Sequence, residues 1–459
     1  MGITNQLIQN CSDIVYHKLP VEVIDRTKYL LLDYLGVATR GMLSESGQAA
    51  QRMVARQENN MGRAVVIGTD ISVGPSDAAL INGIAAHSIE MDDVVNAASL
   101  HPAVTIMSTA LAAGHISGCN GKQMIEAIVA GYEVVVRLGM ALDPAAHYEQ
   151  GFHPTATCGT LGSAITAAKL LKLTDSEMTN ALGIAGSQAA GSMEYLSDGS
   201  FTKRFHGGWA AHSGLIAALL AKEAFTGPGT IIEGKFGFLN SYSPRPKPEL
   251  VLKDWGNPFQ VLATSIKPYA CCRYKQGPID GIIQIMQENQ LTPDDVDSVI
   301  LAVLKAGFAL VVQPEELKQN PRSIVDAQFS MPFGAAVAIL YGKATLEEYT
   351  LDKIRSPEVK NMMRRIRCVE DDEIEKDFPK KWPARATIKT TDGKKFETKI
   401  DYPKGDPENS LSWDELIQKF KGLVQPVFSK EQIDRIIDRV LSLEKIDRFD
   451  EFSAVLIKK

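Results

Sequence analysis

The stretch FTKRFHGGWAAHSG, residues 201–214, sets two basic side chains and two histidines beside a run of glycine and alanine. Such small side chains let the backbones of neighbouring helices approach closely. Residues 208–225 carry apolar and small side chains at spacings of three and four, which predicts a helix. Small residues lie on more than one face of this helix. We therefore expect it to be buried in a bundle, with a cluster of positive charge near its start.

The same helical pattern fills roughly the first 225 residues. Apolar or small side chains recur at helical spacing in three further segments, residues 121–142, 159–173 and 176–196. The pattern predicts a mainly α protein.

The pattern changes after about residue 265. Residues 296–306 alternate like a strand, and residues 384–403 read as a hairpin whose two arms join at Asp392-Gly393. Two helices are predicted between them, at residues 333–343 and 356–367. This part of the chain is therefore predicted to be a smaller α+β domain.

The tail becomes helical again. Ser412 with Glu415, and Ser429 with Gln432, each form the sequence pattern of a capping box at a helix start. Two helices are expected to follow these caps.

Charge and composition exclude several classes of partner. The formal net charge of -6 provides no basic field for nucleic acid or an anionic membrane. No signal peptide is recognisable, and every apolar run stops well short of the roughly 20 residues of a membrane span. The six cysteines form no CxxC pair, so we expect free thiols and no metal site. We expect a cytoplasmic protein with no nucleic-acid or membrane partner.

One motif resembles a nucleotide-binding loop. GTIIEGKF, residues 229–236, matches a P-loop except at Phe236, where the hydroxyl that holds magnesium is required. A helix rather than a strand leads into it, so we interpret it as a loop between helices.

Histidines and carboxylates gather in AHSIEMDDVVNAASLHP, residues 86–102. We expect His87, Glu90, Asp92 and Asp93 on the last turns of a helix, followed by a loop to His101. Carboxylates beside imidazoles raise the imidazole pKa and set its tautomer, as acid–base chemistry near neutral pH requires. A solvated helix end with a loop histidine explains the pattern equally well.

Two more stretches contain candidate groups. In GFHPTATCGTLGSA, residues 151–164, His153 precedes a proline and a helix start whose free N–H groups favour an anion, although a structural turn fits as well. In the opening stretch, Lys203 and His206 share a face if the helix has begun by then. Arg204 and His212 are interpreted as structural.

A fourth stretch lies where the pattern changes. SIKPYACCRYKQGPID, residues 265–280, holds Lys267, Arg273, Tyr274 and Lys275 within nine residues. Clefts between domains are favoured ligand sites. No histidine follows Cys271 and Cys272 in the sequence, so a local Cys-His nucleophile is not indicated.

Taken in order, these stretches resemble the MmgE/PrpD family, whose members include dehydratases, decarboxylases and epimerases of small carboxylates. DAQFSMPFGAAVA, residues 326–338, adds to the resemblance. The resemblance implies an all-helical domain of residues 1–265 together with 405–459, and an inserted α+β domain of residues 266–404. It also implies a homodimer and a cleft that uses no metal and no cofactor.

The resemblance also assigns roles to residues. His101 and His153 match the acid/base pair, and Lys203 and Lys267 match cations that bind carboxylate or relay protons. Asp93 and Glu90 match partners that orient the histidines. We accordingly predict a catalytic set of His101, His153, Lys203 and Asp93. The predicted substrate-binding set is Glu90, His206, Lys267, Arg273, Tyr274 and Gln276.

The reaction expected is removal of water from a small hydroxylated di- or tricarboxylate, after a proton is taken from the carbon next to a carboxylate. The alternatives are an epimerase, a decarboxylase and a carboxylate binder without activity. Glu90, Val94-Val95, Gln276 and Phe333 depart from the family pattern, and these departures argue against decarboxylation of cis-aconitate.

Overall fold

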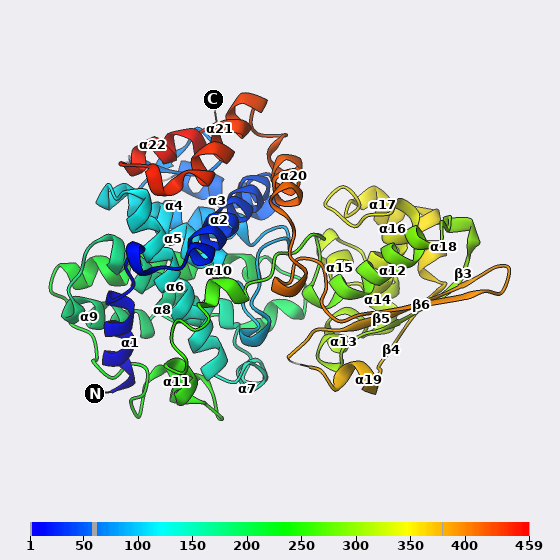
Figure 1. The fold of residues 1–459 in the computed structure, drawn as a ribbon, viewed down its shortest axis with the longest axis horizontal. Helices are drawn as coiled ribbons and strands as arrows, with labels where there is room; N and C mark the ends of the chain where they lie inside the picture. Colours follow the sequence, from blue (N-terminus) through cyan, green and yellow to red (C-terminus); the bar gives the residue numbers. More distant parts are fainter. Residues whose placement is uncertain (1, 57–61, 379, 459) are drawn as a thin grey trace. The chain divides into compact units, whose positions relative to one another are not determined.

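The computed structural model describes residues 2–56, 62–378 and 380–458 (Figure 1). The chain divides into two compact units. The helical unit comprises Met1–Ser88, Asp92–Thr264 and Ser412–Lys459, and the mixed unit comprises Ile89–Met91 and Ser265–Leu411. The mainly α class with a smaller α+β region is confirmed.

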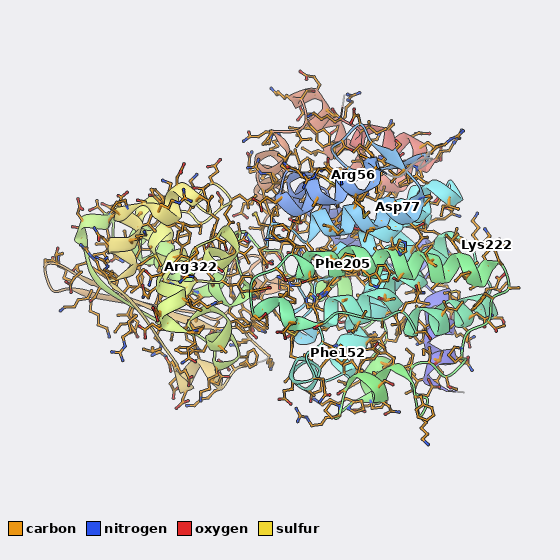
Figure 2. The ribbon with its side chains drawn as sticks, turned by 180° about the vertical axis from the view of Figure 1, so that it is seen from behind. Arg56, Asp77, Phe152, Phe205, Lys222 and Arg322 are labelled. Atoms are coloured by element: carbon orange, nitrogen blue, oxygen red, sulfur yellow. The ribbon has the colours of Figure 1, made fainter. Side chains whose placement is uncertain are left out.

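Helix α10 (Thr202–Lys222) lies at the centre of the helical unit and contains the stretch that opens the sequence analysis. It packs against α4 (Pro75–Ala86), α5 (Ala103–Ser117) and α8 (Pro154–Leu170). Figure 2 shows α10 from Phe205 near its start to Lys222 at its end. The helix begins six residues earlier than predicted, so Lys203 and His206 both lie in its first turns.

Glycines bring α4 and α10 into backbone contact. A Cβ atom added at Gly83 would lie 2.6 Å from the Cα of Gly208, and one at Gly208 would lie 2.1 Å from the carbonyl oxygen of Leu80. Neither position has room for a larger side chain. The close packing expected from the small residues is confirmed.

Other helices of this unit follow their sequence patterns to different degrees. Helix α6 (Gly121–Ala141) has the predicted extent and begins with a capping box at Asn120. Helix α9 (Asp175–Gly186) stops early, so the single helix predicted for residues 176–196 is wrong. A short 3-10 helix, Met193–Leu196, follows after a break. The added Cβ of Gly186 would meet Ile231, which shows how tightly the end of α9 is packed.

The C-terminal helices return to the helical unit, where α20 (Trp413–Val424) and α21 (Lys430–Leu441) pack against α2 (Val21–Gly41), as Figure 1 shows. The capping box of Ser412 and Glu415 is confirmed, and Ser429 caps α21. The remaining elements of this unit are α1 (Ile3–Ser12), α3 (Glu45–Ala55), β1 (Ala64–Val65), β2 (Ser72–Val73), α7 (Pro144–Glu149), α11 (Phe238–Tyr242) and α22 (Phe449–Ser453). The P-loop-like residues 229–236 lie between α10 and α11, where no strand precedes them, as interpreted.

The mixed unit is built on a four-stranded sheet of order β4-β3-β5-β6. Strands β5 (Ala384–Thr390) and β6 (Lys395–Ile400) form the predicted hairpin, with Gly393 at a φ of 88° in its turn. Strand β3 (Val296–Ala302) is shorter than predicted, because α13 begins at Lys305. It pairs parallel with β4 (Ile366–Val369) and antiparallel with β5.

Helices accompany this sheet. Helix α12 (Gln276–Glu288) packs against β5 and β6, and α16 (Met331–Tyr341) lies close to the predicted helix. The helix predicted for residues 356–367 is only partly right: α18 (Pro357–Met363) stops early, and Ile366 pairs with Val299 in the sheet. The other helices are α13 (Lys305–Val311), α14 (Glu315–Gln319), α15 (Ile324–Gln328), α17 (Leu351–Arg355) and α19 (Asp372–Glu375).

Among the helices of the described ranges, none combines the length and the apolar character that a membrane crossing requires.

Candidate active site

Four histidines of the helical unit lie in ring contact with one another. His87 and His101 pack edge to face with ring centroids 5.2 Å apart, and His87 stacks on His153 at 5.6 Å. His153 in turn lies 5.3 Å from His206, and their Nδ1 atoms are 3.1 Å apart. We call His87, His101, His153 and His206 the imidazole cluster.

Each ring comes from a different structural context. His87 is the residue after α4, His153 precedes Pro154 at the start of α8, and His206 lies in the first turns of α10. His101 ends the loop before α5. Residues 88–102 form a loop with only a short 3-10 turn, so the expectation that residues 87–93 continue the helix is wrong.

The carboxylate of Asp92 bridges two members of the cluster. Its Oδ2 lies 2.7 Å from Nδ1 of His87 and 3.1 Å from Nδ1 of His101. Asp92 and His87 are buried. A carboxylate accepts hydrogen bonds, so His87 presents an N–H at Nδ1 to this oxygen, whereas Nδ1 of His101 lies at ion-pair distance from it.

The main chain fixes the tautomer of His101. Its Nδ1 lies 2.6 Å from the carbonyl oxygen of Asp93, and a carbonyl only accepts. Nδ1 therefore carries the proton, and in the neutral ring Nε2 holds the lone pair. The His101 side chain is 14% exposed, whereas the side chains of Asp92 and His87 are almost fully buried. This arrangement resembles the orientation of a general base by a carboxylate.

Burial keeps the other three rings neutral near pH 7. It lowers the pKa of His87 to about 4, against the opposing charge of Asp92. Burial also lowers the pKa of His206 to about 4, and His87 and Lys203 add to the effect. The pKa of His153 falls well below its usual value for the same reason, with His87 and His206 contributing.

Lys203 supplies positive charge beside these rings. It is half-buried in the first turn of α10, and its charge acts on His87, His153 and His206. Because the neighbouring imidazoles are neutral, the Lys203 ammonium group is the positive charge among them that can pair with a bound anion.

Asp93 is placed differently from Asp92. Its Oδ1 accepts from the backbone N–H of Ala103, and its Oδ2 accepts from the Tyr132 hydroxyl at 2.8 Å. Burial raises the pKa of this carboxyl to about 8. Asp93 contacts His101 through its carbonyl, so its carboxyl anchors the loop to α5 and α6.

The remaining predicted residues lie in the mixed unit. Lys267 forms an ion pair with Glu90, with Nζ and Oε2 3.6 Å apart, and both side chains are buried. Gln328 donates from Nε2 to the carbonyl of Ile89, which anchors the same short segment. Glu90 has a φ of 57°, a left-handed conformation that is uncommon for glutamate.

Three further predicted residues make contacts within the mixed unit. Arg273 pairs with Asp406, with Nη2 and Oδ1 2.5 Å apart. The ring of Tyr274 stacks on Trp382 at 4.6 Å. The amide of Gln276 is buried and bonds to the main chain of Tyr269 and Cys271. These contacts position the start of α12.

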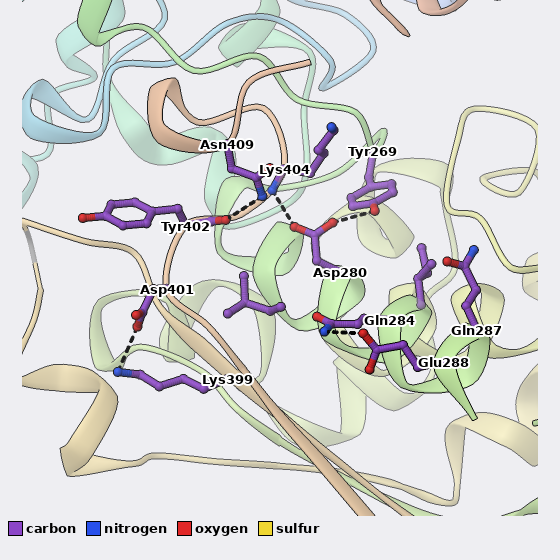
Figure 3. Close-up of a pocket in the computed structure, with 12 residues that line it drawn as sticks. Tyr269, Asp280, Gln284, Gln287, Glu288, Lys399, Asp401, Tyr402, Lys404 and Asn409 are labelled. Atoms are coloured by element: carbon purple, nitrogen blue, oxygen red, sulfur yellow. Dashed lines mark hydrogen bonds and ion pairs between the residues drawn. The ribbon is translucent and has the colours of Figure 1, made fainter. Parts of the chain in front are cut away.

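A separate hollow of about 400 Å³ lies in the mixed unit (Figure 3). At its wall, the carboxylate of Asp280 accepts from the Tyr269 hydroxyl at 2.6 Å and from the backbone N–H of Lys404 at 2.7 Å. Burial raises the pKa of Asp280 to about 6. None of the predicted site residues lines this hollow.

Within the ranges that the structure describes, no three His, Cys, Asp or Glu side chains converge as a metal site would require.

Comparison with known families identifies the chain. Residues 5–251 match the MmgE/PrpD N-terminal domain, and residues 269–443 match the MmgE/PrpD C-terminal domain. The chain belongs to the MmgE/PrpD family. The resemblance seen in the sequence is thereby confirmed.

Relatives of this MmgE/PrpD protein include enzymes of two kinds. A cis-aconitate decarboxylase of Aspergillus terreus is 28% identical over 97% of this chain and 94% of its own. A human cis-aconitate decarboxylase is 27% identical over 93% of this chain and 88% of its own. A 2-methylcitrate dehydratase of Salmonella typhimurium is 22% identical over 95% and 94%.

Within this MmgE/PrpD chain, sequence reasoning left two residues out of the predicted site. His87 and Asp92 were noted in the histidine-rich stretch, but neither entered the predicted set. The structure places His87 between His101 and His153, and places Asp92 against two rings. The sequence signal that could have included them is the presence of five titratable residues within one short stretch, residues 87–101.

Proposed function

We propose that this protein is a lyase that removes water from a small hydroxylated di- or tricarboxylate, starting with proton abstraction next to a carboxylate. The observation that carries the proposal is the orientation of His101. Its Nδ1 is held by Asp92 and by the carbonyl of Asp93, so that Nε2 is the atom that accepts a proton.

The proposed steps use groups that the structure brings together. Nε2 of His101 takes the proton, and the electron pair of the broken C–H bond enters an enolate. The carboxylate of Asp92 stabilises the imidazolium that forms, and Lys203 stabilises the enolate charge. The enolate then expels the hydroxyl group to form a carbon–carbon double bond. The His101 imidazolium returns its proton to the departing hydroxyl group, which leaves as water, and neutral His153, bonded to His206, donates a hydrogen bond to that group.

Decarboxylation is the second candidate, and similarity favours it. The decarboxylases are 27–28% identical to this chain, whereas the dehydratases are 21–22% identical. Dehydration stays the lead because Phe333 departs from the pattern of the decarboxylase branch. Phe333 is fully buried against Tyr349 in the mixed unit, with ring centroids 5.3 Å apart.

The test is a panel of hydroxylated and unsaturated polycarboxylates incubated with the purified protein in D₂O and followed by proton NMR. Dehydration gives new vinyl signals without loss of carbon. Loss of carbon dioxide would identify the decarboxylase, and deuterium exchange without either product would identify an epimerase.

Variants then test the assigned atoms. His101→Ala should lower kcat by about 10²–10⁴-fold, the usual worth of a general base. Asp92→Asn should also lower kcat, while leaving KM nearly unchanged, because it removes the charge that stabilises the His101 imidazolium rather than a substrate contact. His212→Asn, on the same α10 helix as Lys203 and His206, is the matched control and should retain full activity. Full activity of His101→Ala would refute the assignment.

A further inference from the structure

One ring nitrogen in the imidazole cluster is buried without a partner. Nδ1 of His87 bonds to Asp92, whereas Nε2 contacts no hydrogen-bonding atom among the described residues. The side chain has an exposed fraction of 0%. A buried polar atom left unsatisfied costs free energy, and in native proteins such an atom calls for an explanation.

The groups that face His87 come from several elements. They are Asp92 and His101 in the loop that follows α4, His153 at the start of α8, and Lys203 and His206 in the first turns of α10. Asp33 of α2 lies near enough to interact with the charge of Asp92, and it is itself paired with Lys419 at 2.6 Å. Asp92 is therefore the direct carboxylate partner of His87.

These surroundings hold His87 neutral when no anion is bound. Burial opposes its protonation first, and the charges of Lys203 and His101 act in the same direction. A carboxylate placed at Nε2 would reverse this balance, because an opposite charge favours the protonated ring. The imidazolium would then donate from both nitrogens, from Nδ1 to Asp92 and from Nε2 to the new carboxylate.

We propose that Nε2 of His87 binds a carboxylate group of the substrate and takes up one proton from solvent as that carboxylate arrives. The inference rests on the proposed function, because it assumes that an anionic polycarboxylate enters the cluster. It assigns His87 to ligand binding, a role separate from the proton abstraction given to His101.

A consequence is that affinity depends on pH. Binding that takes up a proton weakens as pH rises from the pKa of the free ring toward that of the bound imidazolium, by up to about tenfold per pH unit. The direction is distinctive, because a ligand carboxyl group that ionised on binding would release a proton and would strengthen binding as pH rises.

The experiment uses tricarballylate, a tricarboxylate without a hydroxyl group to eliminate, so that binding is measured without turnover. Calorimetric titration of the full chain at about pH 6, in buffers of different ionisation enthalpy, gives the number of protons exchanged. We expect an uptake close to one proton per bound ligand. Uptake should fall, and the Kd should rise, as pH is increased.

Two substitutions make the test specific. His87→Asn keeps an N–H near the Nδ1 position for Asp92 but removes Nε2. It should abolish most of the proton uptake and weaken binding about 10–100-fold, the worth of one charge-assisted hydrogen bond. His212→Asn is the matched control, because Nδ1 of His212 is also buried without a partner but its ring stacks on Trp209 instead. It should leave uptake and affinity unchanged.

Nitrogen NMR of the histidine-labelled wild-type protein gives a second measurement that needs no variant to fold. The His87 signals should change from a neutral ring to an imidazolium when tricarballylate is added. Binding without proton uptake, uptake that persists in folded His87→Asn, or a His87 ring that stays neutral would each overturn the inference alone. Failure of the wild-type protein to bind tricarballylate, citrate or succinate would overturn the proposed function as well.

Discussion

Glu133 and Arg137, one turn apart on α6, form a buried ion pair, whereas the imidazole cluster places four like rings together beside a lysine. In the pair, Nε of Arg137 lies 2.7 Å from Oε2 of Glu133. Its two terminal nitrogens donate to the carbonyls of Lys253 and Asp254, and Gln260 donates to the second oxygen of Glu133. The charges of this pair therefore neutralise each other, and main-chain groups complete the hydrogen bonds of both side chains.

The imidazole cluster is built in the opposite way. Its rings lower one another's pKa, Lys203 adds to that effect, and Nε2 of His87 has no partner among the described residues. Both regions are buried in the same helical unit. The comparison teaches that a satisfied buried network serves stability, whereas unsatisfied groups of like kind mark a place built for a ligand.

The largest effect on stability should come from breaking the satisfied pair. Arg137→Met leaves Glu133 as an uncompensated buried charge, so the free energy of unfolding should fall by about 3–5 kcal/mol. Urea titration measures this loss. Lys203→Met, at the edge of the imidazole cluster, should cost less than about 1 kcal/mol. Equal losses in the two variants would contradict the distinction between the regions.

A smaller effect should appear on acidification. The pKa of His87 is lowered from 6.5 to about 4 in the folded protein, so the unfolded chain binds its proton at higher pH. The stability due to His87 is therefore complete above about pH 6.5 and is lost as pH falls toward 4, by roughly 3 kcal/mol.

His87→Phe should flatten the pH dependence of unfolding between these limits, as measured by urea titration at several pH values. His17→Phe is the control, since His17 is exposed near the N-terminus and has no part in the cluster. If both variants retain the wild-type slope, the loss of stability in acid has another origin.

Much of this architecture follows from local pattern. The small residues of α10 predict close helix contacts, and alternation around Asp392-Gly393 predicts the hairpin. His153 lies in the imidazole cluster and Lys203 lies beside it, because each is fixed near the start of a helix. Such positions depend on short-range signals that a single sequence contains.

The end of α4 illustrates what the sequence does not show. Ile89 and Met91 continue an apolar pattern after Ala86, and no proline or glycine marks the break. The helix ends because residues 89–91 join the other compact unit, with Glu90 in a left-handed conformation. This tertiary contact moves Asp92 rather than Asp93 against the rings, a result that helical spacing could not give.

The end of another helix was predicted wrongly for the same reason. The pattern of residues 356–367 is helical throughout, yet Ile366 leaves the helix to pair with Val299. Local propensity is overridden where a strand partner far away in sequence supplies main-chain hydrogen bonds.

The smallest effect concerns the contact that holds two sides of the imidazole cluster together. Helix α4 ends just before His87 and α10 starts just before Lys203, so the spacing of these helices sets the spacing of the groups. A Cβ at Gly208 would lie 2.1 Å from the carbonyl of Leu80, a main-chain atom that has to move. Gly208→Ala should cost about 1–2 kcal/mol, since overpacking outweighs the gain in helix propensity.

The matched control is Gly422→Ala in α20, where the added Cβ meets nothing within 4 Å. There only the helix propensity changes, so stability should rise by up to about 1 kcal/mol. The two substitutions are chemically identical and should shift the urea midpoint in opposite directions. Gly208→Ala should also weaken tricarballylate binding, because separating α4 from α10 moves His87 away from Lys203. A Gly208→Ala protein that is more stable and binds unchanged would show that helix spacing does not set the geometry of the cluster.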